Sequence, residues 1–221
     1  MTYQHRHADG SPCALPAGKV VCVGRNYAEH AAELNNPVPA EPILFLKPRT
    51  ALVAMDAPVR VPRGQGACHF ETEMAVLVGA PLNNADEAQV RAAIAGIGLG
   101  LDLTLREVQD GLKAKGLPWE KAKAFDGACP VSAFLAPAAV ADLGNVRIRL
   151  AVNGAVRQDG NTGDMLTPVL PLIAYMSTFF TLEPGDVVMT GTPKGVGPLV
   201  PGDRIRAELG EGWLVVETEA A

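Results

Sequence analysis

Two glutamates and one aspartate carry the strongest chemical signal in the chain. Side chains alternate between faces in an extended strand, so Glu71 and Glu73 point to the same side. Carboxylates held this close repel each other unless a proton or a cation lies between them. Asp102 ends the apolar, glycine-rich segment 97–101, where a charge is costly without a partner. Three oxygen ligands suit Mg²⁺ or Mn²⁺, although these residues alone leave a solvated strand face as an equal alternative.

The residues after Asp102 predict a helix whose polar face lies near those carboxylates. Arg106 and Gln109 follow Asp102 by four and seven residues, which places them near one helix face. Arg106 offers a planar fork for a carboxylate, and Gln109 offers a neutral donor. Taken alone, both residues fit a solvated helix face equally well. Further on, Lys121 and Lys123 alternate with alanine, so we expect one to point inward and pair with the carboxylates.

A histidine and a glutamate near the N-terminus have the spacing of a proton-transfer pair. His30 and Glu33 are separated by three residues on a short predicted helix, where such side chains are neighbours. The carboxylate can orient the imidazole and raise its basicity, so that His30 deprotonates a water molecule. The alternative is a surface histidine beside a surface glutamate, which this spacing alone would favour.

The composition is that of an ordinary globular protein. The 221 residues are 48% hydrophobic and 19% charged, which excludes wholesale disorder. A net charge of −5 and a pI near 5.4 argue against a nucleic-acid or anionic-membrane surface. An acidic substrate must therefore be held by local cations or by a metal. Because no apolar run approaches 18 residues and no signal-peptide core is visible, we expect a soluble, cytoplasmic protein.

The apolar patterns predict many short strands and fewer helices. Strands are expected over 19–23, 43–46, 74–78, 97–103, 146–152, 187–190, 204–209 and 213–218. Helices are expected over 28–34, 85–95, 105–115 and 169–178. Asn153-Gly154 predicts a type I′ hairpin, and Thr104 with Glu107 predicts a capping box on the third helix. Since helices do not alternate regularly with strands, we expect one β-rich α+β domain rather than a doubly wound parallel sheet.

Three patterns that suggest other sites are discounted. The four cysteines are widely spaced and lack a C-x-x-C motif, so they predict neither a zinc site nor a disulfide framework. The glycines at 96, 98 and 100 resemble a dinucleotide fingerprint, but the third glycine is not at the offset that the fingerprint requires. Segment 191–197 resembles a phosphate loop but departs from its pattern, and Pro193 removes a backbone donor. We therefore expect no nucleotide binding.

Six motifs together resemble the fumarylacetoacetate hydrolase family, and in particular its short acylpyruvase and oxaloacetate-handling members. They extend from about residue 19 to residue 209 and are, in chain order, Val23-Gly24-Arg25-Asn26-Tyr27, Leu46-Lys47-Pro48, His69-x-Glu71-x-Glu73, Leu101-Asp102-Leu103-Thr104, Lys123-Ala124-Phe125 and Thr190-Gly191-Thr192-Pro193-Lys194-Gly195-Val196-Gly197. The resemblance implies the family's mixed β-roll with a few short helices, a single catalytic domain over 1–221 with an N-terminal extension over 1–18, and a homodimer.

The resemblance also implies roles for individual residues. One Mg²⁺ or Mn²⁺ would be held by the three carboxylates already named, and the His30–Glu33 pair would lie on a mobile helix that closes over the substrate. Lys123 matches the family's active-site lysine. The residues that match substrate contacts are Arg25, Lys47, Arg106, Gln109 and Thr192.

The implied substrate is a small oxo acid, with no nucleic-acid or membrane partner. The metal would stabilise an enolate formed by hydrolysis of a 2,4-dioxo acid such as an acylpyruvate or fumarylpyruvate, or by decarboxylation or tautomerisation of oxaloacetate. Two alternatives remain open. One is an isomerase of 2-hydroxyhepta-2,4-diene-1,7-dioate in aromatic catabolism, and the other is a catalytically silent oxo-acid-binding protein.

Overall fold

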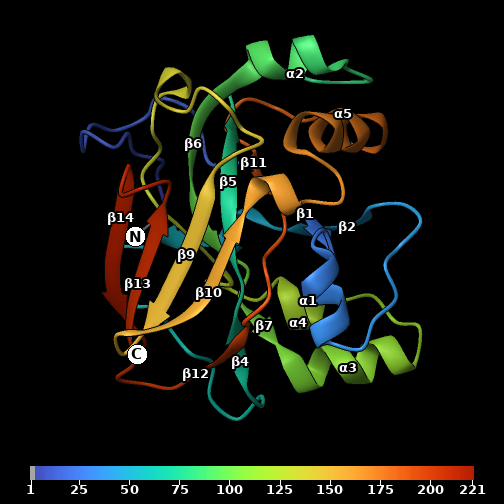
Figure 1. Cartoon of the computed structure of the whole chain (residues 1–221), viewed down its shortest axis with the longest axis vertical. Helices are drawn as coiled ribbons and strands as arrows, with labels where there is room; N and C mark the ends of the chain where they lie inside the picture. The colour runs from blue at the N-terminus through green and yellow to red at the C-terminus, as the bar shows by residue number, and fades with distance from the viewer. Residues whose placement is uncertain (1–2) are drawn as a thin grey trace.

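The computed structural model describes residues 3–221, and a seven-stranded mixed sheet forms its centre (Figure 1). The strands of this sheet are, in spatial order, β2 (Ile43–Lys47), β1 (Val20–Gly24), β11 (Val187–Met189), β5 (Thr72–Val78), β6 (Ile94–Leu101), β8 (Cys129–Val131) and β3 (Leu52–Ala54). The β1–β11 and β3–β8 pairs are parallel, and the remaining pairs are antiparallel.

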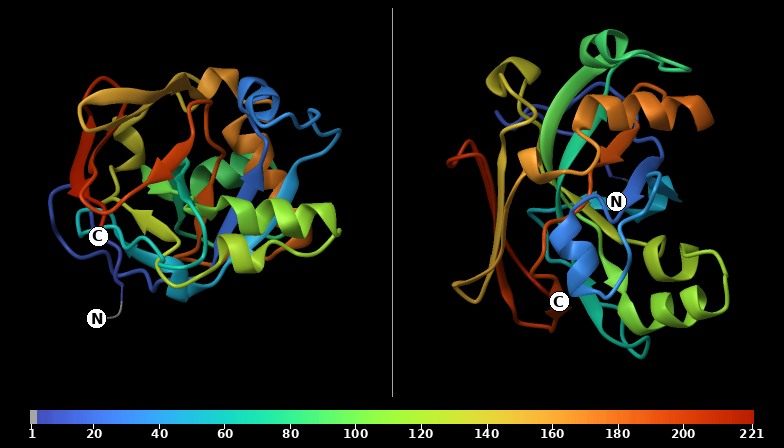
Figure 2. Two further views of the ribbon diagram at one scale, coloured as in Figure 1. Left: turned by 90° about the horizontal axis from the view of Figure 1, so that it is seen from below. Right: turned by 45° about the vertical axis from the view of Figure 1, so that its right-hand side comes forward.

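Two smaller antiparallel sheets complete the β-structure. One contains β10 (Ala155–Asn161), β9 (Arg147–Val152), β13 (Arg204–Leu209) and β14 (Leu214–Glu219), and the other contains β12 (Gly197–Leu199), β4 (Cys68–Phe70) and β7 (Thr104–Leu105). Strand β9 shows how the layers pack, because Ile148, Leu150 and Val152 are buried while Arg149 and Ala151 between them are partly exposed. The sheets curl around a shared apolar core (Figure 2), so the expected β-rich fold is confirmed.

Short helices cover two ends of this roll (Figure 1). At one end, α2 (Glu87–Ala93) packs against α5 (Val169–Phe179). Helix α5 buries Val169, Leu172, Ile173 and Met176, which recur at the spacing of one helix face. At the other end lie α1 (Ala28–Glu33), α3 (Arg106–Ala114) and α4 (Glu120–Lys123). The 3₁₀ turns are η1 (Arg49–Ala51), η2 (Pro137–Ala139) and η3 (Thr162–Asp164). Among residues 3–221, no helix is both long and apolar enough to span a membrane.

Most of the predicted strands form within one to three residues of their expected bounds. Asn153 and Gly154 have φ values of 53° and 79°, as the predicted type I′ hairpin between β9 and β10 requires. The strands missed by the patterns are short ones, β3, β4, β7, β8 and β12, which contain two or three residues each. A run of that length has too few alternations to register as a period.

The capping box expected at α3 is wrong. Thr104 belongs to β7, and the helix begins after Leu105 without a side-chain cap. The Thr104 hydroxyl donates instead to the carbonyl of Asp102, and the Glu107 carboxylate accepts from the backbone N–H of Ala67. The box is found on α2, where the side chains of Asp86 and Gln89 cap each other's backbone N–H groups.

The glycines of β6 allow close packing, in keeping with the discounted dinucleotide reading. A Cβ atom at Gly98 would lie 2.7 Å from the Ser132 hydroxyl, and one at Gly100 would lie 2.6 Å from the Met189 side chain. Ser132 has no freedom to move, since its hydroxyl accepts from the N–H of Leu99 and donates to the carbonyl of Ala133. All four cysteines are buried and free.

Two alanine substitutions should separate packing from helix propensity. Gly98→Ala should lower the free energy of unfolding by about 1–3 kcal/mol, because the added methyl overpacks β6. Gly111→Ala in α3 meets no atom within 4 Å and should raise stability by up to about 1 kcal/mol. Urea unfolding of both variants measures this, and equal shifts would contradict the close packing of β6.

Candidate active site

The three predicted carboxylates meet in the interior, next to the ends of β5 and β6. Glu71 lies in the break between β4 and β5, Glu73 lies in β5, and Asp102 follows β6 directly. The antiparallel register places Thr72 opposite Leu101, and the N–H of Asp102 donates to the carbonyl of Glu71. One carboxylate oxygen from each residue lies within 4.8 Å of the others, and all three side chains are buried. The solvated strand face is therefore wrong for this pair of glutamates.

Two buried lysines compensate Asp102. Lys123, at the end of α4, places its Nζ 2.8 Å from Glu71 Oε2, 2.5 Å from Asp102 Oδ2 and 2.6 Å from Thr104 Oγ1. Lys47, at the end of β2, places its Nζ 2.8 Å from Asp102 Oδ1. Lys121 is exposed, so Lys123 is the inward member of the pair of lysines. Burial would lower the pKa of Lys123, but the charges of Asp102 and Glu71 outweigh it and raise that pKa.

Helix α3 supplies a third cation. Arg106 pairs through Nη2 with Glu71 Oε1, and its Nη1 donates to Gln109 Oε1 at 2.7 Å. Both residues are buried, which excludes the solvated helix face for them. Gln109 therefore orients the guanidinium. The exposed face of α3 carries Glu107 and Asp110, whereas Lys113 is partly buried.

The two glutamates experience opposite electrostatic environments. Burial would raise the pKa of Glu71, but the charges of Lys123 and Arg106 outweigh it and lower that pKa. Burial raises the pKa of Glu73 well above its usual range, and the charges of Asp102 and Glu71 add to the shift. The N–H of Gly191, 2.7 Å from Oε2, and the charge of Lys123 lower the pKa of Glu73 but do not offset the rise. Glu73 is thus the carboxylate that the surrounding cations do not neutralise.

These residues fit a divalent cation. A hard ion beside Glu73 would neutralise the carboxylate that the protein leaves uncompensated. Asp102 Oδ1 contacts Lys47 as an ion pair without hydrogen-bond alignment, so its lone pairs are not committed to a donor. Three carboxylates from two adjacent strand ends are an all-oxygen donor set suited to Mg²⁺ or Mn²⁺.

The His30–Glu33 pair lies on α1 above these carboxylates. His30 Nδ1 is 3.4 Å from Glu33 Oε2, and His30 is only 5% exposed. Both carboxylate oxygens of Glu33 accept from the N–H of Gly195, at 3.0 and 3.2 Å. Glu29 points elsewhere and pairs with Lys194 at 3.0 Å. Helix α1 is therefore held against the 191–197 loop, with the imidazole turned inward.

One small cavity joins these groups. Its free volume is about 30 Å³ with α1 in this position, which is room for one or two water molecules. The side chains or backbones that line it are Val23, Gly24, Arg25, His30, Leu34, Asn36, Phe45, Glu71, Glu73, Arg106, Gln109, Lys113, Trp119, Lys123 and Thr192.

Two of the expected substrate contacts, Arg25 and Thr192, line this cavity. Arg25 lines the cavity and has φ 61°, a backbone conformation that is strained for a residue other than glycine. Thr192 is buried, and its hydroxyl donates to the carbonyl of Thr72 while accepting from the Gln158 amide at 2.7 Å. Strand β10 is thereby fastened to the cavity wall.

Lys47 does not lie where a substrate contact was expected. It is fully buried, does not line the cavity, and reaches the carbonyls of Leu103, Lys123 and Ala128 as well as Asp102. It therefore supports Asp102 from behind rather than reaching into the space where a substrate would lie. The cavity-lining residues that the sequence interpretation missed include Phe45, Trp119, Asn36 and Lys113. Only Lys113 had a signal, because it follows Arg106 by seven residues, two helical turns.

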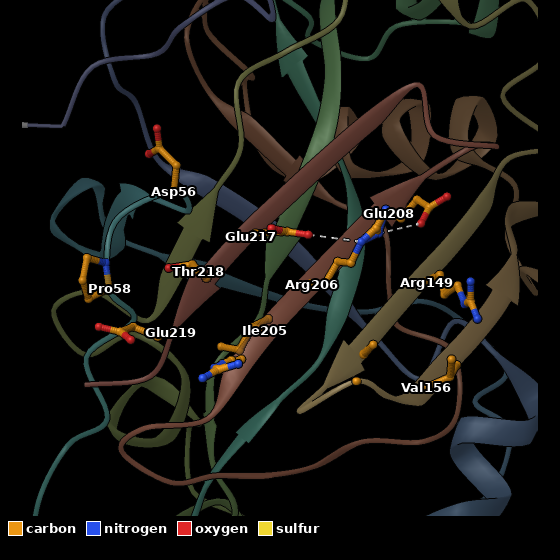
Figure 3. A pocket seen from close by; sticks show the side chains of 13 residues that line it. Asp56, Pro58, Arg149, Val156, Ile205, Arg206, Glu208, Glu217, Thr218 and Glu219 are labelled. Atoms are coloured by element: carbon orange, nitrogen blue, oxygen red, sulfur yellow. Dashed lines mark hydrogen bonds and ion pairs between the residues drawn. The ribbon is translucent and has the colours of Figure 1, made fainter.

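The largest hollow of the described residues lies elsewhere, on the outer face of the sheet that contains β9 and β13 (Figure 3). It has a volume of about 710 Å³. Its charges are paired across neighbouring positions, with Arg206 3.2 Å from Glu208 and 3.4 Å from Glu217. None of the charged residues that line this hollow is buried, so we place the candidate active site at the small buried cavity.

Comparisons with known proteins identify the family of the chain. A family profile described as fumarylacetoacetate (FAA) hydrolase C-terminal matches residues 19–218. The oxaloacetate tautomerase YcgM of Escherichia coli (strain K12) is 55% identical over 205 residues, covering 92% of this chain and 93% of that protein.

Solved structures share the fold over nearly the whole chain. A fumarylacetoacetate hydrolase family protein from Yersinia pestis has a TM-score of 0.97 and 52% identity, covering 99% of this chain and 100% of its own. The fumarylpyruvate hydrolase of Pseudomonas aeruginosa, solved in complex with Mn²⁺ and pyruvate, has a TM-score of 0.90 and 32% identity, covering 98% and 94%. The chain belongs to the fumarylacetoacetate hydrolase family.

Proposed function

We propose that the protein is an enzyme that interconverts the keto and enol forms of oxaloacetate, using a divalent cation on Glu71, Glu73 and Asp102. The observation that carries the proposal is the meeting of this carboxylate cluster with a buried lysine and a histidine–glutamate pair around one cavity, which Glu71, Glu73, Lys123 and His30 line. The 55% identity to an oxaloacetate tautomerase supports the choice of substrate.

The charge of the site favours a substrate with two negative charges. The three buried carboxylates and the three buried cations around them, Lys47, Arg106 and Lys123, sum to zero when all are ionised, and the ion pairs of these cations are with Glu71 and Asp102. A divalent cation would leave two positive charges in a region with little access to water. Oxaloacetate carries two carboxylates, so its binding would restore neutrality.

Each side chain has a distinct part in this proposal. When bound, the cation would supply Lewis-acid stabilisation of negative charge that develops on the 2-oxo oxygen of the substrate. Arg106, oriented by Gln109, would contact the adjacent carboxylate, and Thr192 and Arg25 would border it.

Proton transfer would fall to the residues on α1 and α4. His30, oriented by Glu33, would remove a proton from C3 of the keto acid, which leaves the electron pair as an enolate. Lys123, whose pKa is raised by its carboxylate neighbours, would hold its proton and stabilise the enolate oxygen as a charged donor. Return of a proton to oxygen completes the enol, and the reverse sequence gives the keto acid.

Helix α1 must move for this chemistry to occur. The free volume of about 30 Å³ is too small for a four-carbon diacid, so the cavity has to open before the substrate is admitted. The contacts that hold α1 at the 191–197 loop are few, namely Glu33 with Gly195 and the exposed pair of Glu29 with Lys194. We propose that α1 is a lid that closes over the bound acid.

Hydrolysis of a 2,4-dioxo acid is the second candidate function. It is favoured by the similarity to a fumarylpyruvate hydrolase and by the His30–Glu33 pair, which could equally deprotonate a water molecule. Rates on oxaloacetate enol, acetylpyruvate, fumarylpyruvate and a hydroxyheptadienedioate, each with Mg²⁺ and with Mn²⁺, would rank tautomerisation, decarboxylation, hydrolysis and isomerisation. Turnover of acetylpyruvate with none of oxaloacetate would overturn the tautomerase proposal.

Removal of the cation should abolish activity, and two amide substitutions should separate binding from stability. Glu73→Gln should lower Mn²⁺ affinity more than tenfold while leaving the stability of the metal-free protein equal or higher, because its unpaired carboxylate is lost. Asp102→Asn should lower affinity too, but should destabilise the fold by about 3–5 kcal/mol, because Lys47 loses its partner.

Calorimetric Mn²⁺ titration and urea unfolding in EDTA would measure these two effects. Full turnover by protein that has been stripped of metal would contradict the assigned site.

Substitution of the pair on α1 should slow chemistry more than it weakens binding. His30→Ala should reduce kcat by roughly 10²–10⁴-fold, with a small change in oxalate affinity, because a general base acts mainly in the transition state. Glu33→Gln should have a smaller effect of the same kind. Glu29→Gln on the same helix is the matched control and should retain the wild-type rate, because the Lys194–Glu29 side chains are 57% and 72% exposed and so open an ion pair contributes little to holding α1. A wild-type rate in His30→Ala would move proton transfer to another residue.

We also propose that the protein is a homodimer, as the family resemblance implies. The outer face of the sheet containing β13 and β14 supports a self-complementary contact, because it carries Arg204 and Arg206 beside Glu217 and the exposed Val215. Light scattering in solution should give twice the 23.1 kDa mass of one chain. A mass of one chain at micromolar concentration would contradict it.

We further propose that it is a cytoplasmic protein, which fractionation of its native cells would test.

A further inference from the structure

A polar stripe runs along the cavity-facing side of α3. Arg106, Gln109 and Lys113 are separated by three and four residues, so their side chains share one face of the helix. All three line the cavity. Arg106 and Gln109 are buried beside Glu71, whereas Lys113 lies at the outer end, with its side chain 25% exposed. The stripe therefore extends from the carboxylate cluster to the mouth of the cavity.

Lys113 has a charge that the site does not neutralise. Its Nζ lies 3.1 Å from Asn36 Oδ1, which is a neutral partner, and 3.6 Å from Asp110, whose side chain is 59% exposed. An ion pair that open to water contributes little. Of the other cations that line the cavity, Arg106 and Lys123 are committed to buried carboxylates. Among residues 3–221, Arg25 is the one other cation that lines the cavity and has no buried carboxylate partner.

Asn36 gives this end of the cavity a second donor. It follows α1 by three residues and lines the cavity with Leu34 and Trp119. Its amide oxygen accepts from Lys113, which leaves the amide nitrogen free to donate. An ammonium group and an amide N–H side by side form a suitable receptor for a carboxylate. Because Asn36 follows the lid and Lys113 belongs to α3, an anion between them would contact both walls.

We propose that Lys113 and Asn36 form a subsite for the distal carboxylate of a dicarboxylic 2-oxo acid whose other end lies at the Glu71, Glu73 and Asp102 cluster. The inference rests on the proposed function and specifies what that site selects. It makes Lys113 a specificity-determining residue, which distinguishes a diacid from a monocarboxylic acid of equal length. The contact stabilises the ground state and the transition state alike, so it acts on KM and leaves kcat unchanged.

Calorimetry with two four-carbon ligands tests the subsite without turnover. Malate and 2-hydroxybutyrate both present a 2-hydroxy carboxylate, but only malate has a distal carboxylate. In Mg²⁺-loaded protein, Lys113→Met should weaken malate binding about tenfold and leave 2-hydroxybutyrate unchanged, as loss of one charge-assisted contact predicts. Lys113→Arg should restore most of the malate affinity. Lys115→Met is the matched control, since Lys115 is exposed, two residues away and outside the cavity lining, and it should change neither ligand.

Steady-state kinetics on oxaloacetate provide the second readout. Lys113→Met should raise KM about tenfold, with kcat within about twofold of wild type. Equal losses for malate and 2-hydroxybutyrate, or none for either, would overturn the subsite. So would a malate-selective loss in Arg25→Met that is absent from Lys113→Met. Failure of the proposed function has a different signature, because the wild-type protein would then not turn over oxaloacetate, whatever the malate titrations show.

Discussion

Lys47 and Lys123 together neutralise an aspartate that lies almost entirely out of water, and the rest of the site depends on this arrangement. An unpaired charge at that depth would cost several kcal/mol, so the two lysines and Asp102 have to be ordered together. Arg106 then matches the charge of Glu71. Of the three carboxylates, Glu73 is left without a paired cation, and its charge therefore favours the binding of a metal cation. Stability and function thus draw on the same set of ionic contacts.

The sheet provides the rigidity that these contacts require. Glu73 and Asp102 come from neighbouring strands whose hydrogen-bond register fixes them relative to each other. The glycines of β6 let residues 132–134 pack directly on that strand, so its end has little freedom. By contrast, the proton-transfer pair lies on a six-residue helix with two buried side chains. The proposed metal ligands are therefore built on the hydrogen-bonded central sheet, and the proposed base is built on a short helix with few buried side chains.

The sequence allowed the carboxylate cluster to be predicted because its geometry is local. Two residues on one strand face and a third at the next strand's end are visible as spacing, and so is the i, i+3 pair on α1. The partners of those groups could not be predicted in the same way. Lys47 reaches Asp102 across 55 residues of chain, and nothing in a lysine within an apolar strand shows whether it is buried. The prediction of a capping box at Thr104 was wrong because a distant contact decided the structure there as well. Thr104 pairs with His69 in a sheet, and this pairing overrode its local preference for a helix cap.

The contacts of Gln158 affect how the protein folds. Its buried amide receives the N–H of Thr72 and donates to both Thr192 and the carbonyl of Pro193, so one side chain of β10 ties together three distant stretches of chain. These connections span 34 to 86 residues. Loops of that length must close before any of the contacts can form, which slows folding relative to a protein built from local contacts. A ribosome-bound chain therefore has to release its segment beyond Pro193 before this wall of the cavity can form.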